Sequence, residues 1–172
     1  MKRYHYVGPK EFEHYAESNI VRTQVRSQHD VVAWFQQTHP RLKSYLEVTA
    51  TYIVDTDGHV WVTDRCYEHI ACARGRDVLA AGEITFEVEQ QTVEVTSISN
   101  QSTGYCPEPS CWLAVCEALD AANISRPPSF TYAFDFRLCE VCHSINVIKE
   151  DNFTCEVCST KLPSHWNFRQ RL

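Results

Sequence analysis

Four cysteines near the C-terminus share one spacing. Cys139 and Cys142 form a Cys-x-x-Cys pair, and Cys155 and Cys158 form a second pair after twelve intervening residues. Two such pairs at this separation can bring four thiolates to the corners of one tetrahedron, a ligand set that suits Zn²⁺. Because four sulfur ligands fill the coordination shell, the spacing predicts one structural zinc ion per chain and no open position for a substrate.

The residues between the two pairs are typical of a hairpin. Residues 149–152, Lys-Glu-Asp-Asn, are turn formers between two short apolar segments. In its ligand spacing, the segment 139–158 resembles the broad zinc-ribbon class, and the resemblance covers about twenty residues. A redox dithiol is the alternative reading, but it needs only one Cys-x-x-Cys near a helix start, so two matched pairs favour the metal.

The chain is long enough for one domain with a small appendage. Its 172 residues are 44% hydrophobic, which suffices for an ordinary core. The first twelve residues lack the apolar run of a secretory signal, and no stretch approaches the eighteen apolar residues of a membrane span. Nine cysteines without a signal therefore indicate a reducing compartment, the cytoplasm, where metal ligation and free thiols are commoner than disulfides.

Charge is spread unevenly along the chain. Residues 1–45 carry seven Lys or Arg against four Asp or Glu, residues 46–138 carry five against fourteen, and residues 139–172 carry four of each. These segments contribute +3, −9 and 0 to the net charge of −6. A nucleic-acid-binding protein needs a basic face, so the acidic centre argues against nucleic acid. We expect a protein partner, preferably a basic one, and no membrane.

Period-two alternation of apolar residues predicts a sheet. Residues 47–54 and 60–62 alternate on either side of an Asp-Thr-Asp-Gly turn, and residues 83–88 and 93–95 form a second pair. Residues 130–138 alternate most regularly and predict a fifth strand that leads into the first cysteine. The alternation implies that one face of the sheet packs on the core and that an acidic face meets water.

Helical patterns flank these strands. Pro9 suits the first turn of a helix, and residues 27–30, Ser-Gln-His-Asp, predict a capping box for a second helix that ends at Pro40. The clearest helix opens at residues 107–110 and ends at Asn123. The predicted fold class is α+β, with an antiparallel sheet of about five strands, helices on one face and a C-terminal zinc ribbon.

The chain contains no long linker, so we expect two closely packed parts. The α+β body spans residues 1–138, and the zinc ribbon with its tail spans residues 139–172. Trp166 and Phe168 in the tail are expected to dock on the body, whereas an exposed aromatic pair would mark a partner site.

A polar loop before the clearest helix is a candidate ligand-binding site. Backbone N–H groups of a glycine-containing loop at a helix N-terminus can bind a phosphate, a carboxylate or a nucleotide. An ordinary capped connection uses the same residue types, and the loop lacks the lysine of a P-loop. The loop consists of Ser99, Asn100, Gln101, Ser102, Thr103, Gly104 and Tyr105.

Titratable residues gather just after the strand predicted at 60–62. Glu68 and His69 are candidates for an acid–base pair, and Arg65 is a candidate for holding an anion. Glu83, on the acidic face of a later strand, is a fourth candidate catalytic residue. Neighbours in sequence need not face one cavity, so the alternative is a surface Asp–Arg pair beside a hydrogen-bonded histidine.

Five cysteines lie outside the two pairs, and Cys116 among them falls on the apolar stripe of the clearest helix. Cys106 and Cys111 resemble only in part the zinc deaminase pattern of His-x-Glu followed by Pro-Cys-x-x-Cys. Here the order is Cys-Pro, four residues separate the cysteines, and Glu83 lacks the preceding histidine. Cys106 is also a candidate nucleophile assisted by His69.

Two functions remain open. The first is a cytosolic, zinc-stabilised binding protein whose contact surface is the acidic sheet face or residues 99–105. The second is a small enzyme acting on a nucleotide or other phosphate-bearing ligand, by deaminase-like chemistry or by ADP-ribosyl transfer with Arg65, Ser99 and Glu83. Convergence of the candidate catalytic residues with the polar loop in one pocket would favour the enzyme, and scattering would favour the binding protein.

Overall fold

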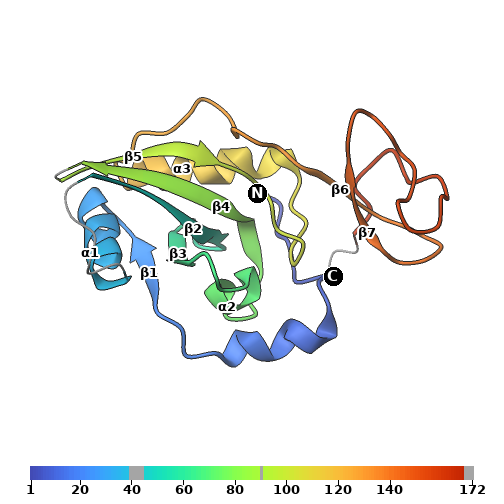
Figure 1. Cartoon of the computed structure of the whole chain (residues 1–172), viewed down its shortest axis with the longest axis horizontal. Helices are drawn as coiled ribbons and strands as arrows, with labels where there is room; N and C mark the ends of the chain where they lie inside the picture. The colour runs from blue at the N-terminus through green and yellow to red at the C-terminus, as the bar shows by residue number, and fades with distance from the viewer. Residues whose placement is uncertain (39–44, 90, 169–172) are drawn as a thin grey trace.

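Five antiparallel strands pair in the order β1-β3-β2-β4-β5 (Figure 1). The computed structural model describes residues 1–38, 45–89 and 91–168. The strands are β1 (Arg22–Val25), β2 (Tyr45–Asp55), β3 (Val60–Asp64), β4 (Val78–Glu89) and β5 (Thr92–Ile98).

One face of the sheet carries the core. Tyr52 of β2 and Phe86 of β4 are buried on this face, and the residues on either side of them along each strand point the other way. The helices α1 (Gln28–Thr38) and α3 (Trp112–Ala121) supply the apolar side chains that complete it, Leu119 among them. This arrangement leaves the alternate residues of β2, β4 and β5 on the second face.

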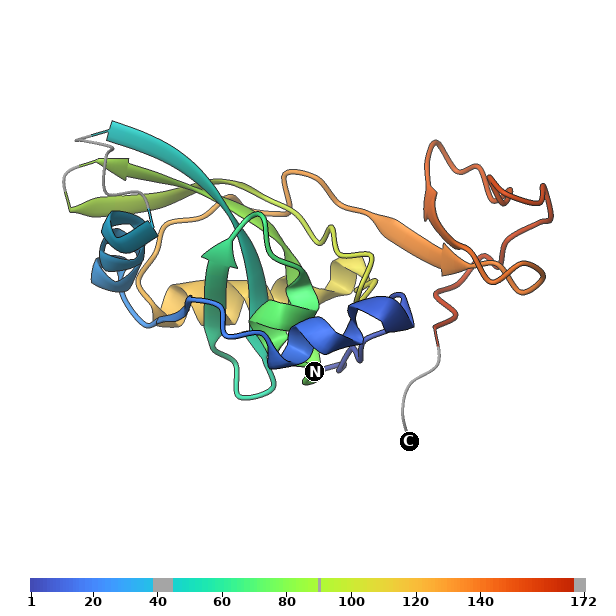
Figure 2. The ribbon, with the colours of Figure 1, turned by 60° about the horizontal axis from the view of Figure 1, so that its bottom comes forward.

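The second face is covered only at one end. There the short helix α2 (His69–Ala73) brings His69 to a hollow that Thr51 and Glu83 also line. The 3₁₀ helix η1 (Lys10–Glu17) packs beside α2 (Figure 2). We call this second face, together with the hollow beside α2, the open face; its strand residues include Glu47, Thr49, Thr51, Glu83, Thr85, Glu87, Glu94 and Ser97.

The last two strands form a hairpin of their own. β6 (Asp135–Leu138) pairs only with β7 (Ile145–Ile148), in a two-stranded sheet. In Figure 1 this hairpin and the loops after it lie at one end of the molecule, beyond the five-stranded sheet. We refer to residues 135–168 as the C-terminal lobe.

The predicted α+β class and five-stranded antiparallel sheet are confirmed, with one strand misplaced. Residues 130–134 form no strand, and β6 does not join the large sheet. Asn100 explains why this segment does not join the sheet. Its side-chain amide binds both the N–H and the carbonyl of Phe134, the two backbone groups that would otherwise pair with a neighbouring strand. The fifth strand is instead β1, a four-residue segment between two helices.

The helices were predicted with mixed accuracy. At the predicted capping box, the Asp30 carboxylate accepts the Arg26 N–H and the Ser27 hydroxyl, and α1 follows. The expected end at Pro40 lies outside the described residues. The helix predicted from Pro9 is the 3₁₀ helix η1, which buries none of its residues. The clearest helix is preceded by a 3₁₀ turn, η2 (Pro109–Cys111), and ends before Asn123, whose φ is 54°.

In the described ranges, no helix is long and apolar enough to cross a membrane.

Candidate functional site

The four predicted metal ligands converge in the C-terminal lobe. The Sγ atoms of Cys139 and Cys158 lie 3.5 Å apart, and those of Cys142 and Cys155 lie 3.6 Å apart. All four sulfurs lie within 4.8 Å of one another, and all four cysteines are free thiols. Tetrahedral Zn–S bonds of 2.3 Å require sulfurs about 3.8 Å apart, so the cluster needs little adjustment to hold a metal ion.

The two Cys-x-x-Cys turns repeat one backbone design. The N–H of Cys139 donates to the Ser144 carbonyl (2.9 Å), and the N–H of His143 returns to the Cys139 carbonyl (3.0 Å). In the second turn, the N–H of Cys155 donates to the Thr160 carbonyl (2.8 Å), and the N–H of Ser159 returns to the Cys155 carbonyl (2.9 Å). His143 and Ser159 occupy equivalent positions and both have left-handed backbones, with φ of 58° and 60°. Both turns therefore present their sulfurs in the same geometry.

Hydroxyl groups support two of the four sulfurs, those of Cys155 and Cys158, as thiolates, whereas the pKa of Cys139 is raised to about 11. The Ser144 hydroxyl contacts Cys155 Sγ at 3.2 Å and, with help from the Cys158 N–H, lowers the pKa of Cys155 to about 5. The Thr160 hydroxyl lies 3.4 Å from Cys158 Sγ and is the main cause of a lowered pKa there. Metal ions bind thiolates rather than thiols, so these contacts favour ligation. The structure thus contains a four-cysteine site able to coordinate a metal ion.

The tail of the chain packs against the body. Trp166 donates its indole N–H to the Cys106 carbonyl at 2.7 Å, and its ring meets Tyr4 edge-on. The Lys2 ammonium lies over the same ring, 3.4 Å from its centre. Phe168 is buried against Phe136 and Cys106. These contacts fix the C-terminal lobe against the N-terminal residues Lys2 and Tyr4 and against Cys106 of the body.

The candidate catalytic residues Arg65, Glu68, His69 and Glu83 line one hollow of about 200 Å³ on the open face. Gln101 and Thr103 of the polar loop line it as well. The Arg65 Nε atom donates to Glu83 at 3.2 Å, so the basic group is already paired with a carboxylate of the sheet. The Thr51 hydroxyl donates to the Tyr67 carbonyl at 3.1 Å and holds this turn over the sheet.

His69 has a defined tautomer. Its Nε2 atom lies 3.0 Å from the Gly82 carbonyl, which can only accept, so Nε2 carries the proton. The Nδ1 atom of the neutral ring is therefore left as an acceptor. Burial is the main cause of a lowered pKa for His69, partly offset by the bond to Gly82, and it keeps the ring neutral. A neutral histidine with an unprotonated nitrogen is suited to accept a hydrogen bond or a proton.

We expect His69 to make the protein less stable in mild acid. An unfolded histidine takes up a proton near pH 6.5, whereas the folded chain resists this because the pKa of His69 is lowered. The free energy of unfolding should therefore fall as the pH drops below about 6.5. Urea unfolding at pH 7.5 and 5.5 should show a smaller loss in His69→Gln, whose amide still donates to Gly82. Equal losses in both proteins would contradict this assignment.

The polar loop is mostly an internal connection. Ser99, Asn100, Ser102 and Tyr105 are buried, and the Tyr105 hydroxyl donates to the Arg76 carbonyl at 2.9 Å. Asn100 bonds Pro107 as well as Phe134. The loop does not stand at the start of α3, because the turn η2 intervenes. Ligand contact from this loop remains a prediction for its outward residues, Gln101, Thr103 and Gly104.

Cys106 and Cys111 do not form a second metal site. Both are buried, and burial raises both their pKa values, that of Cys111 to about 12. In the described part of the chain, the only other group of three metal-ligand side chains is Asp55, Asp57 and His59. Asp55 is occupied by its own turn, since its carboxylate accepts the N–H groups of Asp57, His59 and the Trp61 indole. The geometry thus gives no support to deaminase-like chemistry or to a Cys106 nucleophile.

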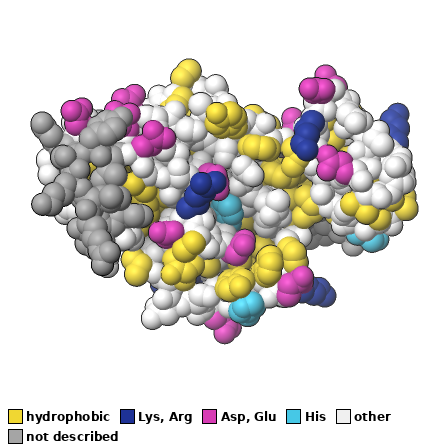
Figure 3. Space-filling view, in the orientation of Figure 1, with side chains coloured by type: hydrophobic (Ala, Val, Ile, Leu, Met, Phe, Trp, Pro, Cys, Tyr) yellow, Lys and Arg dark blue, Asp and Glu magenta, His cyan; other side chains and the backbone are white. Residues whose placement is uncertain are grey.

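Acidic and hydroxyl side chains form rows across the open face. Strand register sets Glu47 beside Glu87, and Glu87 beside Glu94, on β2, β4 and β5. The next row toward α2 consists of hydroxyl residues, Thr49, Thr85 and Ser97 on the same strands. Figure 3 shows acidic side chains gathered over this end of the sheet and a basic side chain near the centre of the face. The predicted acidic face is present. The alignment of its side chains into rows follows from the register of β2, β4 and β5, which the sequence pattern does not specify.

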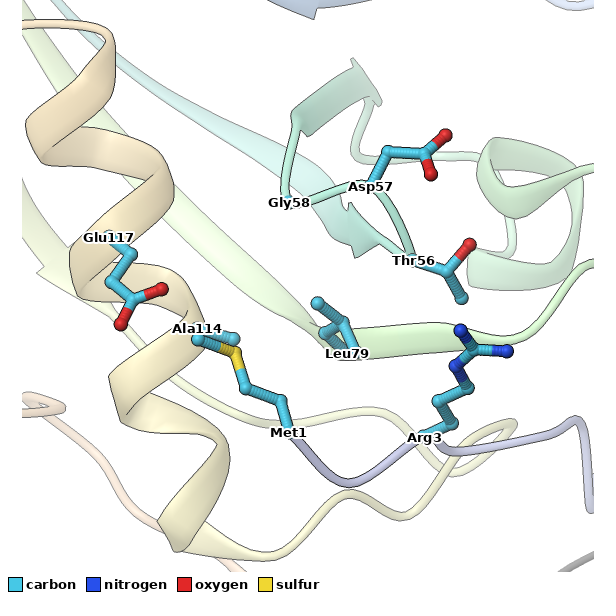
Figure 4. A pocket seen from close by; sticks show the side chains of 8 residues that line it. All are labelled: Met1, Arg3, Thr56, Asp57, Gly58, Leu79, Ala114 and Glu117. Carbon is cyan, nitrogen blue, oxygen red and sulfur yellow. The ribbon is translucent and has the colours of Figure 1, made fainter.

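A separate hollow of about 450 Å³ opens near the N-terminus (Figure 4). Met1 reaches Ala114 of α3, Arg3 lies near Thr56, and Glu117 lines the far wall. None of the residues predicted from the sequence as functional lines this hollow. It combines one basic group with single carboxylates on different elements and contains no nucleophile.

Searches against protein-family models, curated proteins and solved structures return no match to this chain.

Proposed function

We propose that this chain is a zinc-stabilised binding protein whose contact surface is the open face of the sheet. Zn²⁺ at Cys139, Cys142, Cys155 and Cys158 holds residues 139–172 as a ribbon-type lobe against a body of residues 1–138. Four thiolates leave the ion no open position, so its role is structural. The observation that carries the proposal is the hollow at Arg65 and Glu83, where β2, β4, the turn after β3, α2 and the polar loop meet on the open face.

The charge of this hollow favours binding over phosphate chemistry. Arg65 is the one Lys or Arg among the described residues that line the hollow, and Glu83 neutralises it. Glu68 adds a further carboxylate. A phosphate would meet net negative charge and would have to displace an existing ion pair. A neutral or cationic group meets no such penalty.

A small enzyme is the second candidate. The convergence of Arg65, Glu68, His69 and Glu83 in one hollow is the condition that favours it, and the free Nδ1 atom of His69 supplies a base. Ser99, the third residue of the ADP-ribosyl-transfer alternative, lines the adjoining hollow with Arg65 and Glu83. Against this, the hollow is small and open, and Arg65 is tied to Glu83 rather than aimed at a ligand.

An NMR titration distinguishes the two. The ¹⁵N-labelled, zinc-loaded chain is titrated with arginine amide, adenosine monophosphate and a neutral disaccharide, which represent a cation, a phosphate and a polyol. We expect the amide shifts of Thr51, Glu83 and Gln101 to move with arginine amide or the disaccharide, and to move less in Glu83→Gln. Glu117→Gln, on α3 and away from this face, serves as the matched control. Shifts with the nucleotide alone would favour the enzyme, and no shifts on this face would refute both candidates.

A further inference from the structure

Three hollows on the open side of the molecule adjoin one another. The central one, at Arg65 and Glu83, shares both residues with a hollow of about 240 Å³ toward β5. It shares Glu68 and Thr103 with a hollow of about 500 Å³ toward the C-terminal lobe. We refer to the three adjoining hollows together as the trough; they follow one another from the lobe, past α2, to the open face. A trough of this length suits an extended chain better than a compact small molecule.

The end of the trough at the lobe is apolar. Val7 and Phe12 of the N-terminal segment form one side, and Leu138 and Ile145 of β6 and β7 form the other. All four side chains are only partly buried, and three of them pack at the edge of the small cluster around Phe136. They therefore retain apolar surface for a ligand. An apolar side chain that enters this end would bury surface against both the body and the lobe.

Beyond the opposite end of the trough, and outside the residues that line the three hollows, the open face carries a row of carboxylates. Glu47, Glu87 and Glu94 lie in register on three adjacent strands, and like charges directly opposite each other destabilise a sheet. Within the described ranges none of the three forms an ion pair. Basic side chains of a partner would relieve this repulsion. Between this row and Glu83, the Thr49 and Thr85 hydroxyls bond each other at 3.0 Å, and Ser97 accepts from Thr131 at 3.3 Å. Thr49 and Ser97, which are partly exposed, keep a lone pair for a backbone N–H of a partner.

We propose that the trough binds an extended polypeptide segment that carries one apolar side chain and two basic side chains. The apolar side chain enters the end lined by Phe12 and Ile145. One basic side chain meets Glu68, beside the Arg65–Glu83 ion pair, and the second meets the carboxylate row. This inference rests on the proposed function, because it names the partner class of the same face. Acidic segments and nucleic acids are disfavoured by the same charges.

Strand geometry sets the spacing of the basic residues. Glu83 of β4 lies opposite Thr51 of β2. Glu87, in the carboxylate row, lies opposite Glu47, which is four residues from Thr51 along β2. Four residues of a strand span about 13 Å. A bound segment of the same extended geometry therefore places basic residues at positions i and i+4, with both side chains toward the sheet because the side-chain period is two. The apolar residue lies beyond the first of them, on the side of the lobe.

The probe is a blocked heptapeptide, acetyl-Leu-Ser-Lys-Ser-Ser-Ser-Lys-amide, together with the peptide of reversed order, because the direction of binding is open. Control peptides replace both lysines by glutamate, or leucine by serine. Each is titrated into the ¹⁵N-labelled, zinc-loaded chain. We expect one lysine peptide to shift the amides of the trough, the leucine-to-serine peptide to bind about tenfold more weakly, and the glutamate peptide not to bind.

Variants of the protein locate the contacts. Glu87→Gln should weaken binding about two- to fivefold, because it removes one exposed ion pair. Phe12→Ser should weaken it about tenfold and abolish the difference between the leucine and serine peptides; η1 buries none of its residues, so the fold tolerates the change. Glu117→Gln and Leu113→Ser, on α3, are the matched controls.

The outcomes separate this inference from the proposed function. Equal binding of the glutamate and lysine peptides, or shifts that avoid the trough, would overturn the inference. If no peptide binds but arginine amide or the disaccharide still shifts the open face, the partner class is wrong and the proposed function stands. If nothing shifts that face, both fail.

Discussion

Cys155→Ser is expected to abolish metal binding and to unfold the C-terminal lobe while the five-stranded sheet stays folded. Cys155 is 1% exposed, and its sulfur contacts the Cys142 sulfur, the Ser144 hydroxyl and the Asn146 amide within 3.6 Å. Serine supplies no thiolate, so one corner of the tetrahedron is lost. The remaining three ligands hold an ion far more weakly.

We expect the lobe to depend on a bound metal ion because its own core is small. The buried residues around the cluster are Cys139, Cys155 and Leu162, and two of these three are proposed ligands. The other apolar side chains buried in the lobe, Phe136 and Phe168, pack with Cys106 of the body. A segment with so little apolar burial does not fold alone. For such a site the free energy of metal binding, about 10 kcal/mol or more, is in effect the free energy of folding.

Zinc content and tryptophan fluorescence measure the loss. Native mass spectrometry should find one zinc ion on the wild-type chain and none on Cys155→Ser. The emission of Trp166, which packs on Tyr4 and Lys2, should move to longer wavelength as the tail detaches. Trp166→Phe identifies the share of this signal that comes from the tail. Stoichiometric metal and unchanged emission in Cys155→Ser would contradict a structural site.

Cys66→Ser is the matched control. Cys66 is exposed and lies in the turn after β3, outside the metal cluster. Its replacement by serine should leave the zinc content and the emission spectrum unchanged. A loss of metal in both variants would place the ion elsewhere.

The convergence of the four cysteines was predictable because the spacing within each Cys-x-x-Cys pair is a local property. Two Cys-x-x-Cys pairs need only tight turns, and the sequence repeats the same turn, Cys-Glu-Val-Cys followed by His-Ser or Ser-Thr. Both turns adopt the same hydrogen bonds. The hairpins of β2–β3 and β4–β5 were likewise local, since alternation and turn residues lie within one short stretch.

The misplaced strand had a cause distant in sequence. Alternation over residues 130–138 satisfies the pattern of a strand, but pairing depends on a free partner edge. The edge of β5 beside this segment forms isolated hydrogen bonds in place of a regular ladder. The N–H of Thr131 donates to the Ile98 carbonyl, and the Asn100 side chain binds the backbone of Phe134. A buried asparagine that binds a segment 34 residues away has no signature in the pattern of either stretch.

The candidate site was predictable by residue type but not by arrangement. Arg65, Glu68 and His69 are close in sequence, yet their meeting with Glu83 depends on the register of β2 with β4 and on the turn held by Thr51. The carboxylate row depends on register in the same way. Alternation identifies the residues that share a face, whereas their neighbours across the strands follow only from the pairing.

Gly82→Ala is expected to destabilise the whole protein by about 3 kcal/mol or more. Gly82 lies in the middle of β4, opposite Tyr52 of β2. A Cβ atom there would lie 2.0 Å from the Ser99 carbonyl oxygen and 3.0 Å from the Asn100 Cα. Both are backbone atoms, and the Ser99 carbonyl is also held by the Tyr52 hydroxyl at 2.9 Å. The clash therefore cannot be relieved by a side-chain rotation.

The substitution should also disturb the trough. To make room, the chain at residues 99–100 must move away from β4, and Gln101 and Thr103 move with it. The Gly82 carbonyl accepts the His69 N–H, so α2 is coupled to the same displacement. For a chain of this length, the midpoint of thermal unfolding should fall by about 6–12 °C, and binding at the open face should weaken in parallel.

Gly104→Ala provides the comparison that isolates the cause. It makes the same chemical change in the polar loop that Gly82 contacts, but its Cβ would meet the Tyr6 ring, at 2.9 Å from Cε2, rather than backbone. Tyr6 is only partly buried and its ring can shift, so we expect less than about 1 kcal/mol of destabilisation. Thermal unfolding of both variants under one set of conditions measures the difference. Similar values for the two would show that β4 and the polar loop can separate freely, and that the close approach at Gly82 does not position the open-face site.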